Sequence, residues 1–124
     1  MTVSASQLEL VTELFADLRG VSTRRMFGGA GVYAQGVMFA LVDDDVIYLK
    51  VDDALRADLT AEGSVPWVYG ARAGEPIQTG YVSLPDAALD DPETACAWAR
   101  RALDVALVKQ AAGPKKKKTP LPDA

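Results

Sequence analysis

A glycine-rich stretch, Arg24–Tyr33, constrains the fold of this 124-residue chain more than any other segment. It holds three glycines within four positions, Gly28, Gly29 and Gly31, directly after two arginines and a Met-Phe pair. Glycine lets the backbone adopt positive φ or approach a neighbouring backbone closely, at an entropic cost. Because the apolar run Val37–Val42 follows almost at once, we expect the glycines to form a tight turn from which a β-hairpin starts.

The same glycines do not match the known nucleotide-binding motifs. A phosphate-binding loop requires a Lys-Ser or Lys-Thr pair directly after its glycines, and none lies there after Gly31. A dinucleotide fingerprint lies after a strand and before a helix, whereas here a helix is expected before the glycines and a strand after them. A weak anion site remains as an alternative, with Arg24 or Arg25 above the amides of Gly28 and Gly29.

The absence of histidine narrows the chemistry that the chain can perform. It removes the commonest general base and metal ligand, and with them every Ser-His or Cys-His pair. Three adjacent aspartates, Asp43–Asp45, lack the alternate spacing, the glycine and the distal glutamate of a calcium loop, so we interpret them as a solvated turn. We expect no catalytic residue, no metal and no cofactor.

Length and cysteine usage indicate one domain in the cytoplasm. A chain of this length fits a single domain with one core. The single cysteine, Cys96, excludes an internal disulfide, and we expect it to pack inertly in the core. The first twenty residues carry three acids and no basic region, so no signal peptide is predicted. No apolar run approaches the ~20 residues of a membrane span, and we expect a soluble cytoplasmic protein.

Charge divides the chain into an acidic body and a basic tail. Residues 1–108 carry eight basic and sixteen acidic side chains, while residues 109–124 carry five lysines and one aspartate. We place the folded domain at 1–112 and a disordered, Lys/Pro-rich tail at 113–124. The tail contains Lys115, Lys116, Lys117 and Lys118. An acidic body is a poor surface for DNA, so only this tail is expected to bind nucleic acid, and only weakly. A solubilising terminus is the simpler interpretation.

Three amphipathic helices are predicted from apolar periodicity and capping residues. Their expected positions are Gln7–Arg19, about Asp53–Glu62, and from Pro92 onward. The first is expected to start with a capping box formed by Ser6 and Glu9. The N-caps expected for the other two are Asp52 or Asp53, and Asp91.

Five strands are predicted around the second helix. They are expected at Gly31–Ala34, Val37–Val42, Val46–Val51, Pro66–Gly70 and Ile77–Leu84. The element order α-β-β-β-α-β-β-α, with short turns between the first three strands, predicts an α+β fold. It is a two-layer sandwich with helices on one face of a mainly antiparallel five-stranded sheet. Lys50 lies beside Tyr48 on a half-apolar face; we interpret it as a solvated strand end, with a ligand contact as the alternative.

Three segments carry a resemblance to a known family: Arg25–Tyr33, Gly36–Ala40 and Ile47–Val51. With this element order, residues 5–110 closely resemble the TfoX (Sxy) N-terminal domain family. The resemblance implies a fold like that of secretion chaperones and an association with regulation of natural competence. In that role the full-length regulator acts with the cyclic-AMP receptor protein at particular promoters. The full-length regulator also has a helical C-terminal domain, whereas here only the lysine-rich tail follows the last helix, so we expect a stand-alone member.

Three functions follow from these observations. The leading hypothesis is a non-enzymatic protein-interaction or accessory regulatory module, whose partner is another protein and for which a homodimer is left open. The alternative is a small-anion or metabolite-binding domain that uses Arg24, Arg25, Lys50 and the amides of Gly28 and Gly29. The third is weak nucleic-acid binding through the lysine tail.

Overall fold

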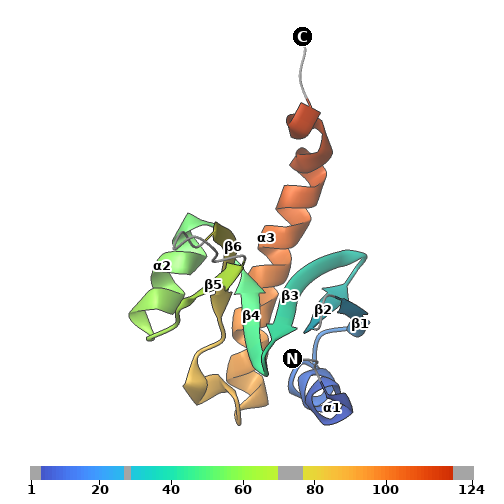
Figure 1. Ribbon diagram of the computed structural model, residues 1–124, viewed down its shortest axis with the longest axis vertical. Helices are drawn as coiled ribbons and strands as arrows, with labels where there is room; N and C mark the ends of the chain where they lie inside the picture. Colours follow the sequence, from blue (N-terminus) through green and yellow to red (C-terminus); the bar gives the residue numbers. More distant parts are fainter. Residues whose placement is uncertain (1–3, 27–28, 70–76, 119–124) are drawn as a thin grey trace.

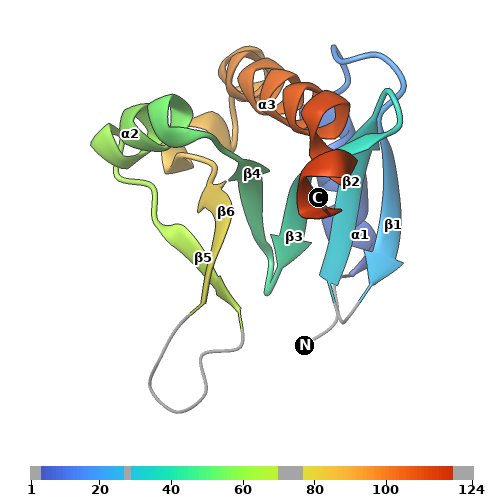
Figure 2. The same cartoon turned by 90° about the horizontal axis from the view of Figure 1, so that it is seen from above.

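A curved antiparallel sheet flanked by three helices makes up the computed structural model, which describes residues 4–26, 29–69 and 77–118 (Figures 1 and 2). The helices are α1 (Ala5–Leu14), α2 (Asp53–Ala61) and α3 (Pro92–Lys118), with a short 3-10 helix η2 (Asp86–Ala88). The strands are β1 (Ser22–Met26), β2 (Gly29–Ala34), β3 (Val37–Asp43), β4 (Val46–Lys50), β5 (Pro66–Tyr69) and β6 (Ile77–Ser83). Their order across the sheet is β1-β2-β3-β4-β6-β5, and neighbouring strands are antiparallel. The predicted α+β class is confirmed.

The sheet has six strands rather than five, because the segment before the glycines is itself a strand. β1 pairs with β2 so that Arg24 lies opposite Gly31. Gly29 and Gly31 therefore lie within β2, while Phe27 and Gly28 fall outside the described residues. β1 escaped prediction because it is an edge strand with exposed polar side chains, so it lacks the apolar alternation that marks a half-buried strand.

The first helix starts earlier and ends sooner than predicted. Its N-cap is Ser4, whose Oγ accepts a hydrogen bond from the backbone N–H of Gln7 at 3.0 Å. Ser4 and Gln7 have the same Ser-x-x-Gln/Glu spacing as the predicted capping box of Ser6 and Glu9. Either serine fits the pattern of an N-cap, and in the structure the helix starts at Ser4. Beyond the helix, Phe15 and Leu18 remain buried because the chain continues in tight turns.

The caps of the two other helices agree with the predictions. Asp52 accepts a hydrogen bond from the backbone N–H of Leu55 at 2.9 Å and starts α2. Asp91 accepts from Thr94 Oγ1 at 2.8 Å, immediately before Pro92 begins α3. α3 runs on to Lys118, into the segment where the tail was expected, and its last turns extend beyond the sheet (Figure 1). The boundary between 112 and 113 stays a prediction, and residues 119–124 lie outside the described ranges.

The main core lies between the sheet and the helices. α3 crosses β3 and β4, α1 packs beside α3, and α2 lies against β6. α3 approaches the sheet closely because small side chains line its buried face: Ala95, Ala99, Ala102 and Ala106. Phe15 and Phe39 pack edge to face with ring centroids 5.7 Å apart. Cys96 is buried, and its Sγ lies 3.4 Å from the carbonyl oxygen of Leu14, so the predicted packing role is confirmed.

Candidate functional site

Gly29 serves the packing of the sheet. A Cβ at this position would collide with the backbone carbonyl oxygen of Val42, so only glycine lets β2 lie at this distance from β3. Adjacent strand residues point to opposite faces, so Arg24 and Arg25 leave β1 on different sides. The guanidinium of Arg24 lies over the ring of Tyr33, 5.6 Å from its centroid. The structure therefore does not bring the two arginines to one side of the glycines.

The face of the sheet opposite the main core carries a small aromatic cluster. Trp67 on the edge strand β5 contacts Tyr48 and Tyr81, with ring centroids 6.1 and 5.9 Å away. Its indole N–H donates to Asp43 Oδ2 at 2.9 Å, which fixes the ring. The Nζ of Lys50 lies 4.8 Å from the centroid of the Tyr81 ring. Trp67 and Tyr81 pack edge to face; Tyr81 is buried, and Trp67 and Tyr48 are half-buried.

Burial changes the acid–base behaviour of three groups in this cluster. Burial, and secondarily the nearby Tyr33, raise the pKa of Tyr81 to about 12. Burial also raises the pKa of Tyr48, and the negative charges of Asp43 and Asp44 add to the effect. The pKa of Lys50 is lowered, first by burial and then by the positive charge of Lys109. The predicted residue Lys50 therefore has a cationic neighbour on α3.

Lys50 and Lys109 line one hollow of about 400 Å³ beside α3, together with Tyr81, Gln110 and part of the β2–β3 hairpin. Arg24 lines a different hollow with Tyr33 and Gln35. The two hollows share only Gly36. Sequence reasoning found Lys50 but missed Lys109, which it grouped with the basic end of the chain. No local signal links the two lysines, because only the crossing of α3 over the sheet brings them together.

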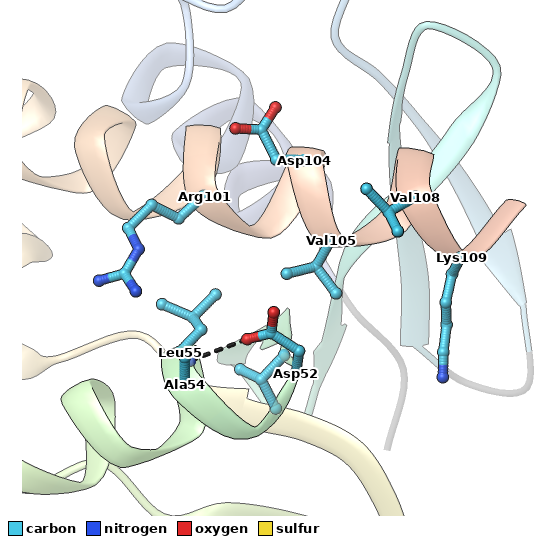
Figure 3. Close-up of a pocket in the computed structure, with 9 residues that line it drawn as sticks. Asp52, Ala54, Leu55, Arg101, Asp104, Val105, Val108 and Lys109 are labelled. Carbon is cyan, nitrogen blue, oxygen red and sulfur yellow. Dashed lines mark hydrogen bonds between the residues drawn. The ribbon is translucent and has the colours of Figure 1, made fainter. Parts of the chain in front are cut away.

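A cleft of about 330 Å³ lies between α2 and α3 (Figure 3). Its apolar lining includes Val51 and Leu55 on one side and Val105 and Val108 on the other. Val108 is 69% exposed, the largest exposed fraction among the described large apolar side chains. The sequence predicted a helix from Pro92 onward but gave no signal that Val108 lines a cleft, so this wall was missed. An exposed valine beside an apolar cavity favours the binding of an apolar group.

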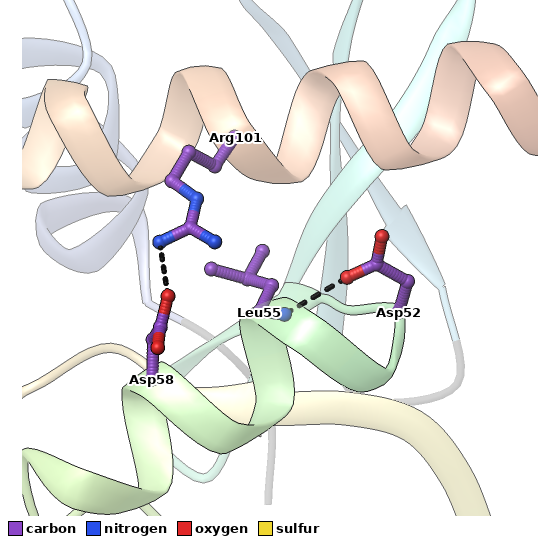
Figure 4. A network of polar contacts seen from close by, with 4 residues as sticks. All are labelled: Asp52, Leu55, Asp58 and Arg101. Atoms are coloured by element: carbon purple, nitrogen blue, oxygen red, sulfur yellow. Dashed lines mark hydrogen bonds and ion pairs between the residues drawn. The ribbon is translucent and has the colours of Figure 1, made fainter.

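Two of the charged groups around this cleft already serve the fold (Figure 4). The carboxylate of Asp52 caps α2, and Arg101 Nη1 lies 2.8 Å from Asp58 Oδ2, which links α3 to α2. Arg101 also lies over the Trp98 ring, 5.7 Å from its centroid. The side chains of Asp104 and Lys109 line the cleft and make no hydrogen bond or ion pair within residues 4–26, 29–69 and 77–118. They are the charges available to a bound molecule.

The described ranges hold neither a metal cluster nor a membrane-spanning helix. No three Asp, Glu or Cys side chains gather there in a way that would hold a metal ion. None of the helices described combines the length and the apolar character needed to cross a bilayer.

The comparisons with known proteins identify a family. The family model described as TfoX N-terminal domain matches residues 13–106, which include all six strands, α2 and most of the buried part of α3. No curated protein matches the chain.

Proposed function

The chain belongs to the TfoX N-terminal domain family, and from this premise we propose that it is a non-enzymatic protein-interaction module with an accessory regulatory role. The observation that carries the proposal is the cleft between α2 and α3, which Leu55, Val105 and the exposed Val108 line together. The expected occupant is an amphipathic helix of a partner protein. Its apolar side chain would enter the cleft, as in other complexes in which a helix binds a groove.

The physical gain from such a contact is the removal of apolar surface from water. Burial stabilises by roughly 25 cal/mol per Å² of apolar surface, so covering one or two valines contributes on the order of 2 kcal/mol. Asp104 and Lys109 have opposite charges and lie on the same helix, so they fix the direction in which a charged partner helix can lie. The cleft thus offers both affinity and orientation.

A non-enzymatic role is supported by the chemistry of the cleft. The chain has no histidine, its cysteine is buried, and Asp52 and Arg101 are occupied by the cap and the ion pair. Following the family resemblance, we propose that the partner is related to transcription regulation and that the protein acts in the cytoplasm. Nucleic-acid binding through Lys115–Lys118 stays a separate prediction, since those side chains lie outside the described part of the chain.

The proposal is tested by capture with the purified full chain and with two variants. Val108→Asp places a charge in the cleft, whereas Leu89→Asp places one at a residue that is 41% exposed and does not line the cleft. Both sites are exposed, so both variants are expected to fold, which circular dichroism checks. We expect a transcription-related protein from extract of the source organism to bind the wild type and Leu89→Asp but not Val108→Asp. Equal capture by all three chains would contradict the proposal.

A further inference from the structure

We propose that Lys50 and Lys109 form a binding site for a small oxyanion, a phosphate or a carboxylate, in the hollow between the end of β4 and α3. This site adjoins the α2–α3 cleft, with which it shares Lys109, and the inference goes beyond the protein-interaction role. It rests on the donors that line the hollow, on the absence of acid among them, and on the way Lys50 is held.

The polar groups that line the hollow are donors suited to an anion. Two ammonium groups, of Lys50 and Lys109, are accompanied by the hydroxyl of Tyr81 and the amide of Gln110. The Tyr81 hydroxyl makes no hydrogen bond within the described residues, and its pKa of about 12 keeps it protonated as a donor at neutral pH. Among the described residues that line the hollow, none carries a carboxylate. The hollow therefore has positive potential on a chain whose net charge is −4.

Lys50 is held in place on the sheet. It is half-buried at the end of β4, opposite Tyr81 on β6, and its Nζ lies over the Tyr81 ring. Within the described ranges it has no carboxylate within 4.0 Å. Burial and the charge of Lys109 both disfavour the ammonium form of Lys50, as its lowered pKa shows. A bound oxyanion would relieve both effects, because it supplies the missing counter-charge.

Two carboxylates lie near Lys109 but do not pair with it. Asp52 and Asp104 line the neighbouring α2–α3 cleft, which Lys109 also lines, but neither carboxylate lies within ion-pair distance of Lys109. Lys109 is exposed on α3, so it can turn toward an anion without disturbing the core. The proposed pair from β4 and α3 keeps Lys50 from the predicted set of Arg24, Arg25 and Lys50, while Arg24 lines a different hollow.

The test is a titration of the isotope-labelled full chain, followed by its amide and lysine side-chain NMR signals. The probes are inorganic phosphate and citrate, at constant ionic strength in chloride. We expect saturable changes at Gly36, Gly80 and Gln110 with at least one probe, and the stronger probe identifies phosphate or carboxylate as the preferred group. Shifts that rise linearly with both anions would overturn the proposal.

Variants decide whether the two lysines carry the binding. Lys50→Met and Lys109→Met should each weaken it at least tenfold, whereas Arg24→Met, in the other hollow, should leave it unchanged. Because Lys109 is exposed, Lys109→Met keeps the test valid even if Lys50→Met unfolds. Equal affinity of Lys109→Met and the wild type would overturn the proposal. Val108→Ser separates the two inferences, because it removes the apolar contact without placing a charge next to Lys109: it should weaken partner capture and leave the anion affinity within about twofold.

Discussion

Gly29 determines how closely two central strands can lie. A side chain there would meet the carbonyl oxygen of Val42, which belongs to the backbone and cannot rotate away. We expect Gly29→Ala to lower the free energy of unfolding by about 2–3 kcal/mol, measured by urea denaturation. Gly20→Ala is the matched control, because it has open space around it and only a positive φ of 72° to strain it, which costs about 1 kcal/mol. Equal losses in the two variants would contradict this role.

Tyr81 makes stability sensitive to alkaline pH. Its pKa is raised from 10.0 to about 12 in the folded chain, so the folded state disfavours the phenolate. The contribution of the neutral hydroxyl to the free energy of unfolding is fully present below pH 10 and is lost as the pH rises toward 12. The full shift corresponds to about 2.7 kcal/mol, which solvent screening reduces to on the order of 1 kcal/mol.

The comparison of wild type with Tyr81→Phe measures this contribution. The difference in unfolding free energy between them should change between pH 10 and pH 12, with the wild type losing more. Lys50 acts in the opposite sense: because its pKa is lowered in the folded chain, its effect on the free energy of unfolding becomes more favourable as the pH rises. Lys50 is present in both chains, so its effect cancels in the difference between them. A difference that stays constant over this range would show that the hydroxyl is not buried as described.

Asp52, the N-cap of α2, and Asp58, within α2, allow the contribution of a helix cap to stability to be compared with that of a surface ion pair. Asp52 satisfies the backbone N–H of Leu55, so Asp52→Ala should cost about 1 kcal/mol and Asp52→Asn much less. Asp58 pairs with Arg101, but their side chains are 55% and 44% exposed, so Asp58→Ala should cost less than about 0.5 kcal/mol. Chemical denaturation of the three variants checks the ranking. A larger loss at Asp58 than at Asp52 would mean that the ion pair holds α2 against α3.

Most elements could be predicted because they carry local signals. Gln35 and Gly36, between β2 and β3, and Asp44 and Asp45, between β3 and β4, all have positive φ. This is the conformation that tight hairpin turns require. β1 could not be found in this way, because four of its five residues, Ser22 to Arg25, are polar and show no apolar alternation. The start of α1 was ambiguous between two serines with equivalent spacing.

The candidate sites were harder to predict than the elements, because each joins distant parts of the chain. The α2–α3 cleft and the Lys50–Lys109 hollow both depend on where α3 crosses the sheet. Helical periodicity predicted α3, yet it indicated neither that Val108 lines a cleft with α2 nor that Lys109 lines a hollow with Lys50. Strand order and helix crossing come from long-range packing, for which a single sequence offers no local pattern.

The whole molecule is stabilised by a core that ends well before the chain does. Ala106 is the last buried apolar residue among those described. Truncation after Gly113 should therefore change the melting temperature by less than about 2 °C, because it removes no described core contact. Differential scanning calorimetry measures this, and a loss of several degrees would move the domain boundary beyond residue 112.

The same truncation should abolish any salt-sensitive DNA binding by the lysines at 115–118.

The central claim is that the cleft between α2 and α3 contacts a protein partner. It is tested most directly by a photo-crosslinking amino acid at position 108 in the full chain, produced in the source organism, with the same group at position 89 as the control. The account predicts a discrete adduct with one partner protein at position 108 and none with that protein at position 89. The same adducts at both positions, or no adduct at position 108, would contradict it.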